Sequence, residues 1–446
     1  MKGNEILRSM SEIEESYVVE AASLKSTHKK MTVIRWISLA AAFCLVVHFA
    51  FFRDNSVTPV HAVDLMEGIT ANSVETVNLH GGVSEITDFS VRLTQMANAA
   101  GENTMISPLS LLYAMAMTAN GAEGETLAQI ESAFGMTIEE LNGWLYTFSR
   151  EIDGGQFRIA NAIWFKDDSR FHVRRDFLQT NANYYAADLY QAAFNEDTLT
   201  DINNWVSQKT DGMIPKLLEK IDPDDVMYLI NALCFDGVWE TPYLDSQVRE
   251  DLFYREDGET VTVDFMHSTE SLFLKDANAT GFIKPYEGRE YAFVALLPNE
   301  GSSVEEYLAS LSGDGLANLL AGAQAVPVTA SLPKFETEYS VLMNGILEDM
   351  GIRHAFNAKE ADLSSLGTSD GGNLYISQVL QKTFISVDER GTKAAASTEV
   401  TITNESAIEP EYMETVKLDR PFVYMIVHIE TGTPLFIGTM TDPGAE

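Results

Sequence analysis

The chain has 446 residues, of which 45% are hydrophobic and 22% charged, and its 66 acidic against 30 basic side chains give a net charge of −36. A chain of this length can bury a large core and form one to three domains. The negative charge excludes nucleic acid as an expected partner, because phosphate backbones are bound by Lys and Arg.

The cysteine and histidine pattern predicts neither a disulfide framework nor a metal site. Only Cys44 and Cys234 are present, in two apolar stretches far apart in the sequence. The sequence has no CxxC and no HExxH pattern, and its eight His residues are scattered. We therefore expect no bound metal and no cofactor.

The N-terminal part predicts an address segment. Residues 1–30 are polar and charged and precede the apolar stretch MTVIRWISLAAAFCLVVHFAFF at 31–52, which can span a membrane if Arg35 reaches the interface. Lys29 and Lys30 before this stretch predict a cytosolic N-terminus and a single-pass cell-membrane protein with its C-terminal part outside. The alternative is secretion after cleavage near Ala62. Residues 53–80 are predicted to be a polar linker.

From residue 81 to the end the sequence alternates helical and strand patterns in one predicted domain. Predicted helices lie within 107–135, where a Gly-rich turn separates two of them, and at 201–220 and 340–352. Predicted strands lie at 157–165, 226–240, 291–298 and 326–340, with a hairpin at 422–440. Helices come first and strands dominate the second half, which predicts an α+β domain with large antiparallel or mixed sheets.

One catalytic pattern occurs, GTSDG at 367–371, which fits the G-x-S-x-G nucleophile elbow. The elbow needs a strand before the serine and a helix after it. Here a helical stretch precedes Ser369 and the strand-like NLYISQVL follows, so we interpret the pattern as a loop. A hydrolase that uses Ser369 is the weakest of our hypotheses.

The stretch ERGTKAAASTEVTIT at 389–403 is able to form a strand where its flanks predict a loop. Its alternate residues divide into two faces. One face is small and then apolar, suited to burial: Thr392, Ala394, Ala396, Thr398, Val400 and Ile402. The other face is mostly polar: Lys393, Ala395, Ser397, Glu399, Thr401 and Thr403. The alternation favours insertion of this segment as a strand over a core.

With its flanks, this stretch resembles the hinge of the reactive-centre loop of serpins, in which Asp-Glu-x-Gly-Thr is followed by small residues. The segments NTMISPLS, INALCFDGVWE and RPFVYMIVHIETGTPLFIGTMTDP resemble further serpin segments in the family's order. The resemblance covers roughly residues 80–446 and is closest to the bacterial type. It implies the serpin fold, with helices in the N-terminal half, three β-sheets and an exposed reactive-centre loop.

The resemblance also implies two groups of structural residues. The loop hinge comprises Glu389, Gly391, Thr392, Ala394, Ala395 and Ala396. The shutter and breach, which hold the strands of the main sheet together, comprise Asn103, Ser107, Ser110, Asn231, Trp239 and Gln381. Serpins usually have His where this chain has Gln381, and we expect its amide to join the same cluster, because an amide both donates and accepts hydrogen bonds.

By resemblance, the protein is not an enzyme but a monomeric suicide-substrate inhibitor of serine endopeptidases. The target protease attacks the loop and forms a covalent 1:1 acyl-enzyme. The cut loop then inserts into the main sheet and traps the protease. The alternative is a non-inhibitory serpin that acts as a binding or chaperone module, against which the small-residue hinge argues.

The scissile bond is predicted from family spacing. Counting from the hinge gives Glu405–Ser406, whereas counting back from Arg420–Pro421 gives a site near Pro410. Bonds after Thr403, Asn404 or Ala407 also stay open. Small residues suit an elastase-like protease, which is the first expected partner, and Glu405 suits a glutamyl-specific protease, which is the second.

Overall fold

Helices occupy most of the first half of the domain and strands most of the second. The computed structural model describes residues 61–99, 101–152, 156–168, 171–370, 373–392 and 413–445. Its α-helices are α4 (Val83–Ala97), α5 (Pro108–Ala119), α6 (Gly124–Phe134), α7 (Ile138–Glu151), α8 (Arg175–Tyr185), α9 (Glu196–Lys209), α10 (Val304–Ser310), α11 (Gly313–Ala321) and α12 (Asn344–Asp349). The predicted α+β class is confirmed.

The main sheet has the strand order β1-β5-β3-β6-β16-β17-β7, and β14 pairs with the other edge of β16. Its strands are β1 (Ala62–Asp64), β5 (Asp188–Ala192), β3 (Phe157–Lys166), β6 (Met227–Phe235), β16 (Gln378–Val387), β17 (Gly391–Thr392), β7 (Gly237–Val238) and β14 (Phe335–Leu342). β3 lies antiparallel to β6 along almost its whole length, whereas β16 runs parallel to β6. The central strands β6 and β16 are therefore each supported on one side by a long partner.

Two further sheets and one short strand pair complete the described part. The six-stranded sheet contains β10 (Leu272–Lys275), β11 (Ala279–Pro285), β12 (Tyr291–Pro298), β19 (Phe422–His428), β20 (Pro434–Met440) and β2 (Thr104–Ile106). The four-stranded sheet contains β18 (Glu414–Lys417), β13 (Val328–Pro333), β9 (Thr260–Glu270) and β8 (Val248–Tyr254). The pair is β15 (Gly367–Ser369) with β4 (Phe171–Val173), so Ser369 ends a short strand and does not precede a helix.

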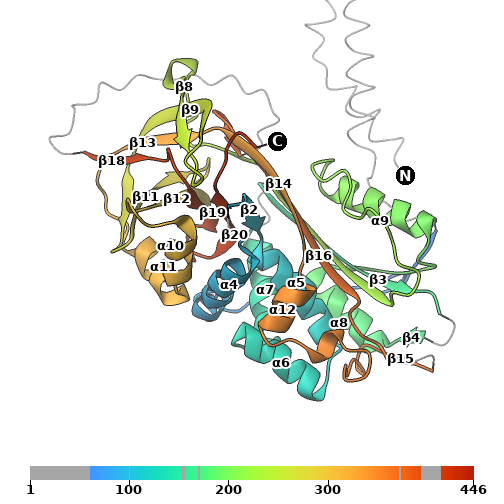
Figure 1. Cartoon of the computed structure of the whole chain (residues 1–446). Helices are drawn as coiled ribbons and strands as arrows, with labels where there is room; N and C mark the ends of the chain where they lie inside the picture. Colours follow the sequence, from blue (N-terminus) through green and yellow to red (C-terminus); the bar gives the residue numbers. More distant parts are fainter. Residues whose placement is uncertain are drawn as a thin grey trace, which may run out of the picture. The chain divides into compact units, whose positions relative to one another are not determined.

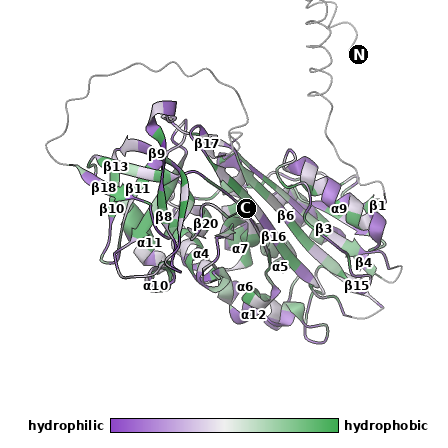
Figure 2. Cartoon of the chain, turned by 45° about the horizontal axis from the view of Figure 1, so that its top comes forward, coloured by the Kyte–Doolittle hydropathy of each residue, from purple (hydrophilic) through white to green (hydrophobic). Residues whose placement is uncertain are grey.

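Both faces of the main sheet are covered, which explains why β3 and β6 are almost continuously apolar. Along β3, Ile163 faces the large core shared with α5 and α7, whereas Trp164 faces a second core with Trp205 of α9. Figure 1 shows α9 on one side of the sheet and α5, α7 and α8 on the other. Figure 2 shows both hydrophobic and hydrophilic colours along the central strands, whereas every residue of α5 is buried.

The helix predicted at 201–220 begins earlier and ends earlier in the structure. The Asn195 side chain accepts hydrogen bonds from the backbone of Asp197 and Thr198, so α9 begins at Glu196. It ends at Lys209, before Gly212, whose φ is 78°. The cap at Asn195 lies before the apolar periodicity that marked the helix.

Residues 61–80, the part of the predicted linker that the structure describes, are packed along the domain. Ala62 pairs with Ala192, so β1 extends the edge of the main sheet. Further along, Leu79 is buried and its carbonyl accepts a hydrogen bond from Trp144 Nε1 at 2.9 Å. Leu65 and Met66 also pack against the large core. Scattered apolar residues within a polar segment give no periodic signal, which explains the difference from the prediction.

The predicted membrane location is corrected. No helix in the described part of the chain is long and apolar enough to cross a membrane. The stretch 31–52 on which that prediction was based, like the rest of residues 1–60, lies outside the described residues.

Candidate functional site

A tight turn after β16 directs the predicted hinge back onto the main sheet. Asp388 Oδ1 accepts hydrogen bonds from two backbone N–H groups of the turn, at 2.7 and 3.1 Å. Thr392 then pairs with Val387 of β16 on one side and with Gly237 of β7 on the other. β17 is therefore the first part of a strand that lies between β16 and the continuation of β6.

Gly391 lies at a close approach of two backbones. A Cβ atom at this position would lie 2.0 Å from the carbonyl oxygen of Gly237. Gly237 is itself confined, because its own Cβ would lie 2.5 Å from the ring of Phe235. The pairing of β17 with β7 therefore needs glycine on both strands, which gives a physical reason for the glycine in the hinge pattern.

Thr392 anchors the first residue pair of this strand to the core. Its side chain is buried, and its hydroxyl lies 2.5 Å from the hydroxyl of Tyr286. Burial raises the pKa of Tyr286 far above its usual value, so this hydroxyl stays protonated and able to donate. The inward face of the hinge thus begins on a small, hydrogen-bonded side chain.

Glu389 joins the turn to the main sheet's outer strand. Its carboxylate lies 2.9 Å from Nζ of Lys334, which immediately precedes β14. The hydrogen bond from Lys334 lowers the pKa of Glu389 and raises the pKa of Lys334. The backbone contributes as well, because Tyr243 N donates to the Glu389 carbonyl at 2.8 Å.

Trp239 closes the same end of the sheet. Its Nε1 donates to the Asp388 carbonyl at 2.9 Å, and its backbone N donates to the Arg390 carbonyl at 2.8 Å. The buried indole stacks on Tyr286 with 4.5 Å between ring centroids. Lys284 Nζ lies 5.4 Å from the indole centroid. Trp239 therefore holds the turn through two hydrogen bonds and a packed ring.

A second group of predicted residues meets between α5 and the central strands. The Gln381 amide donates to the Ser107 carbonyl at 2.8 Å and accepts from the Ser107 N–H at 2.9 Å. Ser110 Oγ donates to Asn231 Oδ1, and Asn231 Nδ2 donates to Asn161 Oδ1 of β3. These hydrogen bonds connect the start of α5 to β16 through Gln381 and to β6 through Asn231.

The two central strands are paired at one end only. β16 pairs directly with β6 over Gln378–Leu380, opposite Tyr228–Ile230, and the described strands have no further pairing to each other beyond these residues. At the other end β17 lies between β16 and β7. The neighbouring edges of 381–386 and 231–236 therefore carry no strand between them in the described part of the chain, at the level of Gln381 and Asn231.

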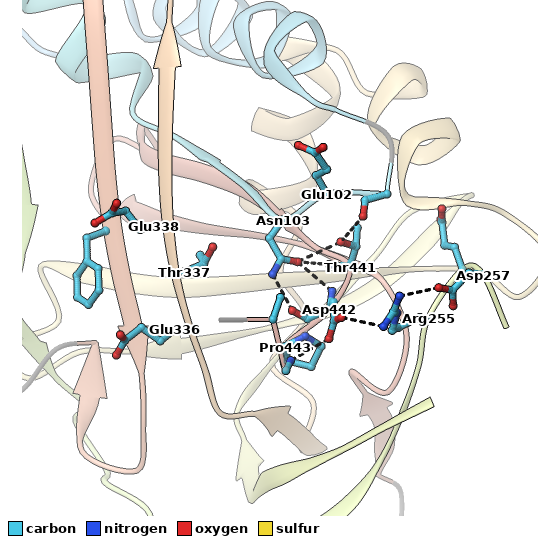
Figure 3. Close-up of a pocket in the computed structure, with 15 residues that line it drawn as sticks. Glu102, Asn103, Arg255, Asp257, Glu336, Thr337, Glu338, Thr441, Asp442 and Pro443 are labelled. Carbon is cyan, nitrogen blue, oxygen red and sulfur yellow. Dashed lines mark hydrogen bonds and ion pairs between the residues drawn. The ribbon is translucent and has the colours of Figure 1, made fainter. Parts of the chain in front are cut away.

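Asn103 lies apart from this hydrogen-bonded cluster. Its Nδ2 donates to the Asp442 carbonyl at 2.6 Å, and its Oδ1 accepts from the backbone N–H groups of Thr441 and Asp442. Figure 3 shows this arrangement in a groove of about 1050 Å³, beside Arg255, which pairs with Asp442 at 3.1 Å. The Asn103 side chain thus holds the C-terminal segment beside β2.

The remaining predicted positions are not part of the described structure. Ala394, Ala395 and Ala396 of the hinge and the proposed scissile pair Glu405 and Ser406 all lie outside the described residues.

Several contacts at these sites were not predicted. Asn161 joins the cluster around Asn231, Lys334 pairs with Glu389, and Tyr286 bonds to Thr392. Gly237, which pairs closely with Gly391, was not predicted either, but it did have a signal in the sequence: a glycine within an apolar strand indicates a close backbone approach. The other partners come from distant parts of the chain, and their residue types are ordinary for a strand.

Comparison with known proteins gives one consistent result. The model of the family "Serpin (serine protease inhibitor)" matches residues 84–443. An uncharacterized serpin-like protein of Thermococcus kodakarensis is 30% identical, over 81% of this chain and 85% of that protein. The Homo sapiens leukocyte elastase inhibitor is 30% identical, over 78% of this chain and 94% of that protein. The native structure of tengpin, a thermophilic serpin, is 49% identical with a TM-score of 0.82, covering 86% of this chain and 100% of that one.

The comparisons also bear on the predicted biochemical class. The prediction that the protein is not an enzyme is corrected to the statement that the comparisons support: the matched family is one of serine protease inhibitors, and the relatives include leukocyte elastase inhibitors.

Proposed function

Because the chain belongs to the serpin family, we propose that it inhibits serine endopeptidases as a suicide substrate, through insertion of its reactive loop into the main sheet. The observation that carries this proposal is the position of β17. Gly391 and Thr392 already lie between β16 and β7, at the end of the unpaired stretch between the two central strands. Residues 393 onward can extend β17 into that stretch without any new strand direction.

The registers of the sheet predict which residues this extension would bring together. Thr392 is opposite Val387 of β16 and Gly237 of β7, and both pairings are antiparallel. Continued without a bulge, they bring residue 398 opposite Gln381 on one side and Asn231 on the other. Gln381 and Asn231 are themselves at the same level in the parallel register of β16 and β6. The two registers are thus compatible with one inserted strand.

The side chains of the loop suit this register. Directly opposite residues face the same side of a sheet, so Thr398 would face the buried cluster formed by Gln381 and Asn231. Alternation gives the same inward direction to Ala394 and Ala396. Small side chains meet little resistance at these positions, whereas large or charged ones would have to displace the core. Each added ladder hydrogen bond contributes about 0.5–1.5 kcal/mol net, so on the order of 10 kcal/mol is available along a strand bonded on both sides.

The chemistry belongs to the target protease. Its serine oxygen attacks the carbonyl carbon of the scissile residue, and the amine of the next residue leaves after it has taken a proton from the protease's histidine. The ester that remains links the two proteins 1:1. Insertion of the freed loop then moves and distorts the protease, so that its oxyanion hole is lost and water no longer completes the hydrolysis.

We propose Glu405–Ser406 as the scissile bond and elastase-like proteases as the first target class. The leukocyte elastase inhibitors among the relatives support this class, as do the small residues Thr403 and Ala407. A glutamyl-specific protease is the second candidate, because Glu405 would then occupy its primary pocket.

The test uses the full chain with neutrophil elastase, pancreatic elastase, chymotrypsin, trypsin, subtilisin and a glutamyl endopeptidase. We expect a covalent band on a denaturing gel for at least one elastase, and a released C-terminal peptide that begins at Ser406 by mass spectrometry. Cleavage within 403–407 by every protease without a covalent band would instead identify a non-inhibitory binding or chaperone module.

A further inference from the structure

A cavity of about 760 Å³ lies between α7, α8 and β3. Sites that bind small molecules usually have volumes of roughly 300–1,000 Å³. One wall of the cavity comes from residues 71–76, which precede the first family-matched residue, 84. The cavity is therefore formed jointly by the family domain and the segment before it.

The wall formed by residues 71–76 is held in place by hydrogen bonds at both ends. The backbone N–H of Asn72 donates to Asn183 Oδ1 at 2.7 Å, and Gln179 Nε2 donates to the carbonyl of Thr70 at 2.8 Å. Val77 N donates to Thr147 Oγ1 at 2.9 Å. The segment is thus tied to α8 at one end and to α7 at the other, so the cavity has a fixed third side.

The charge of the cavity is opposite to that of the protein. Arg150 and Arg158 line it, and none of its described lining residues is Asp or Glu, although the whole chain has a net charge of −36. Arg158 is paired with Asp211. Arg150 has no carboxylate within ion-pair distance in the described part of the chain, and its guanidinium lies over the Tyr146 ring at 5.7 Å from the centroid. A guanidinium of this kind is available to an anion.

Aromatic side chains supply the apolar part of the lining. Tyr146 and Tyr184 meet edge to face with 6.2 Å between their ring centroids, and Tyr113 and Tyr185 do the same at 6.2 Å. Burial raises the pKa values of Tyr113 and Tyr185 well above their usual value, so these phenols stay neutral and do not repel an anion. Flat rings beside a guanidinium match a ligand with an aromatic ring and an anionic group.

Amide groups add further donors. Asn183 Oδ1 already accepts from Asn72 N and from Gln179 Nε2, whereas the Asn183 NH2 group has no acceptor within the described part of the chain. Asn161 also lines the cavity, and it accepts the hydrogen bond from Asn231 described above. The cavity thus combines guanidinium and amide donors with tyrosine rings.

We propose that this cavity binds a small aromatic organic anion, of the aryl sulfonate or aryl carboxylate class, with its anionic group on Arg150 and its ring against Tyr146 and Tyr184. Arg150 is the main anion contact because no carboxylate of the described residues lies within ion-pair distance of its guanidinium. Arg158 adds a weaker contribution, since it shares its charge with Asp211.

A second cavity provides an internal control. About 400 Å³ in volume, it lies between α4, α11 and the six-stranded sheet and is mainly apolar, with Leu320 and Val427 in its lining. Its only arginine among the described lining residues, Arg289, is paired with Glu240. An apolar probe could enter either cavity, so the test must separate charge from hydrophobicity.

The test is a fluorescence titration of the full chain with 8-anilinonaphthalene-1-sulfonate, an aryl sulfonate. We expect Arg150→Gln to weaken its binding at least about tenfold, as for the loss of one hydrogen bond to a charged group, and Arg150→Lys to retain part of the affinity. The matched Arg289→Gln variant is expected to bind as the unmodified protein does. The neutral analogue N-phenyl-1-naphthylamine is expected to bind Arg150→Gln and the unmodified protein with equal affinity.

Arg150 is exposed and lies in the last turn of α7, so its variants are expected to fold, which thermal unfolding checks. Unchanged sulfonate affinity in Arg150→Gln overturns the proposal. Loss of affinity in Arg289→Gln alone also overturns it, because the probe would then occupy the second cavity. An equal loss of the neutral analogue in Arg150→Gln has the same consequence, since the effect would not depend on the anionic group.

Discussion

The carboxylate of Glu389 and the ammonium group of Lys334 lie 2.9 Å apart and join the turn after β16 to the start of β14. Both side chains are about one-third exposed, 33% and 32%, so solvent weakens the pair without removing it. Since β14 is the outer neighbour of β16, the pair fixes the turn from which the loop begins.

Reversing one charge of this pair should destabilise the uncleaved protein. We expect Glu389→Lys to lower the free energy of unfolding by about 1 kcal/mol, because two cations then face each other at a half-buried site. The double variant Glu389→Lys with Lys334→Glu should recover at least half of this loss. Urea unfolding of the unmodified protein, the single variant and the double variant measures their free energies of unfolding. A double variant no more stable than the single one would show that the ion pair itself contributes nothing to stability.

The sequence identified the family and the α+β class, because both depend on local residue order. The stretch from Asp388 to Thr392 forms its turn through Asp388 itself, so nearby residues were sufficient to recognise it. Asn103 was different, because its partners at 441–442 lie at the other end of the chain. A side-chain amide can serve many hydrogen-bonding sites, and only the folded arrangement selects one of them.

The hairpin of β8 and β9 and the packing of residues 61–80 were also not predicted. β8 has the sequence VREDLFY, in which charged residues interrupt the apolar alternation. Residues 61–80 contain single buried apolar residues such as Leu79 rather than a repeating apolar pattern. Residues 61–80 depend on packing with distant elements, for which a single sequence gives no periodic signal. β8 pairs with the adjacent β9, but its charged residues hide this local pairing.

Gly391→Ala should disturb the pairing of β17. The added Cβ would meet the Gly237 carbonyl oxygen at 2.0 Å, and relief requires β17 or β7 to move. We expect a loss of about 1–3 kcal/mol in the free energy of unfolding, as for other overpacked sites. Gly345 of α12 is the matched control, because nothing lies within 4 Å of its Cβ; Gly345→Ala should be neutral or stabilise by about 0.5–1 kcal/mol. Equal effects of the two substitutions would contradict the close approach at Gly391.

His428 predicts a loss of stability in mild acid. Its imidazole is buried between Phe148 and Tyr291, at centroid distances of 5.3 and 5.9 Å, and this burial lowers its pKa below 6.5. In the unfolded chain the ring takes up a proton near pH 6.5, so the unfolded state binds more protons as the pH falls. The contribution is present above the unfolded pKa and is lost as the pH falls toward the folded one.

We therefore expect the free energy of unfolding to decrease between pH 7.5 and 5.5, with a slope of at most about 1.4 kcal/mol per pH unit from this one group. His428→Gln should have a shallower slope. Some slope should remain, since burial also lowers the pKa of His267. Parallel curves for the unmodified protein and His428→Gln would show that His428 does not contribute.

The sharpest test of loop insertion compares two neighbouring alanines. A loop that inserts by continuing the register of β17 would give Ala396 the inward direction of buried Thr392 and would give Ala395 the opposite one. Insertion would place a charged Ala396→Arg side chain over the core, where an unpaired charge is costly, whereas Ala395→Arg would keep its charge in solvent. We expect Ala396→Arg to be cleaved by the target protease without a covalent band, and Ala395→Arg to inhibit as the unmodified protein does.

Titration of a fixed amount of protease with each variant measures the efficiency of inhibition, as the number of inhibitor molecules consumed per protease molecule inactivated. That number should rise at least about tenfold for Ala396→Arg and stay within about twofold for Ala395→Arg, because a barrier of 1.4 kcal/mol already changes the partition between trapping and release by a factor of ten. The opposite ranking would mean that the inserted strand has slipped by one residue, since such a slip exchanges the two faces. Equal inhibition by both variants would mean that residues 395 and 396 do not enter the sheet, and inhibition by insertion would then be excluded for this protein.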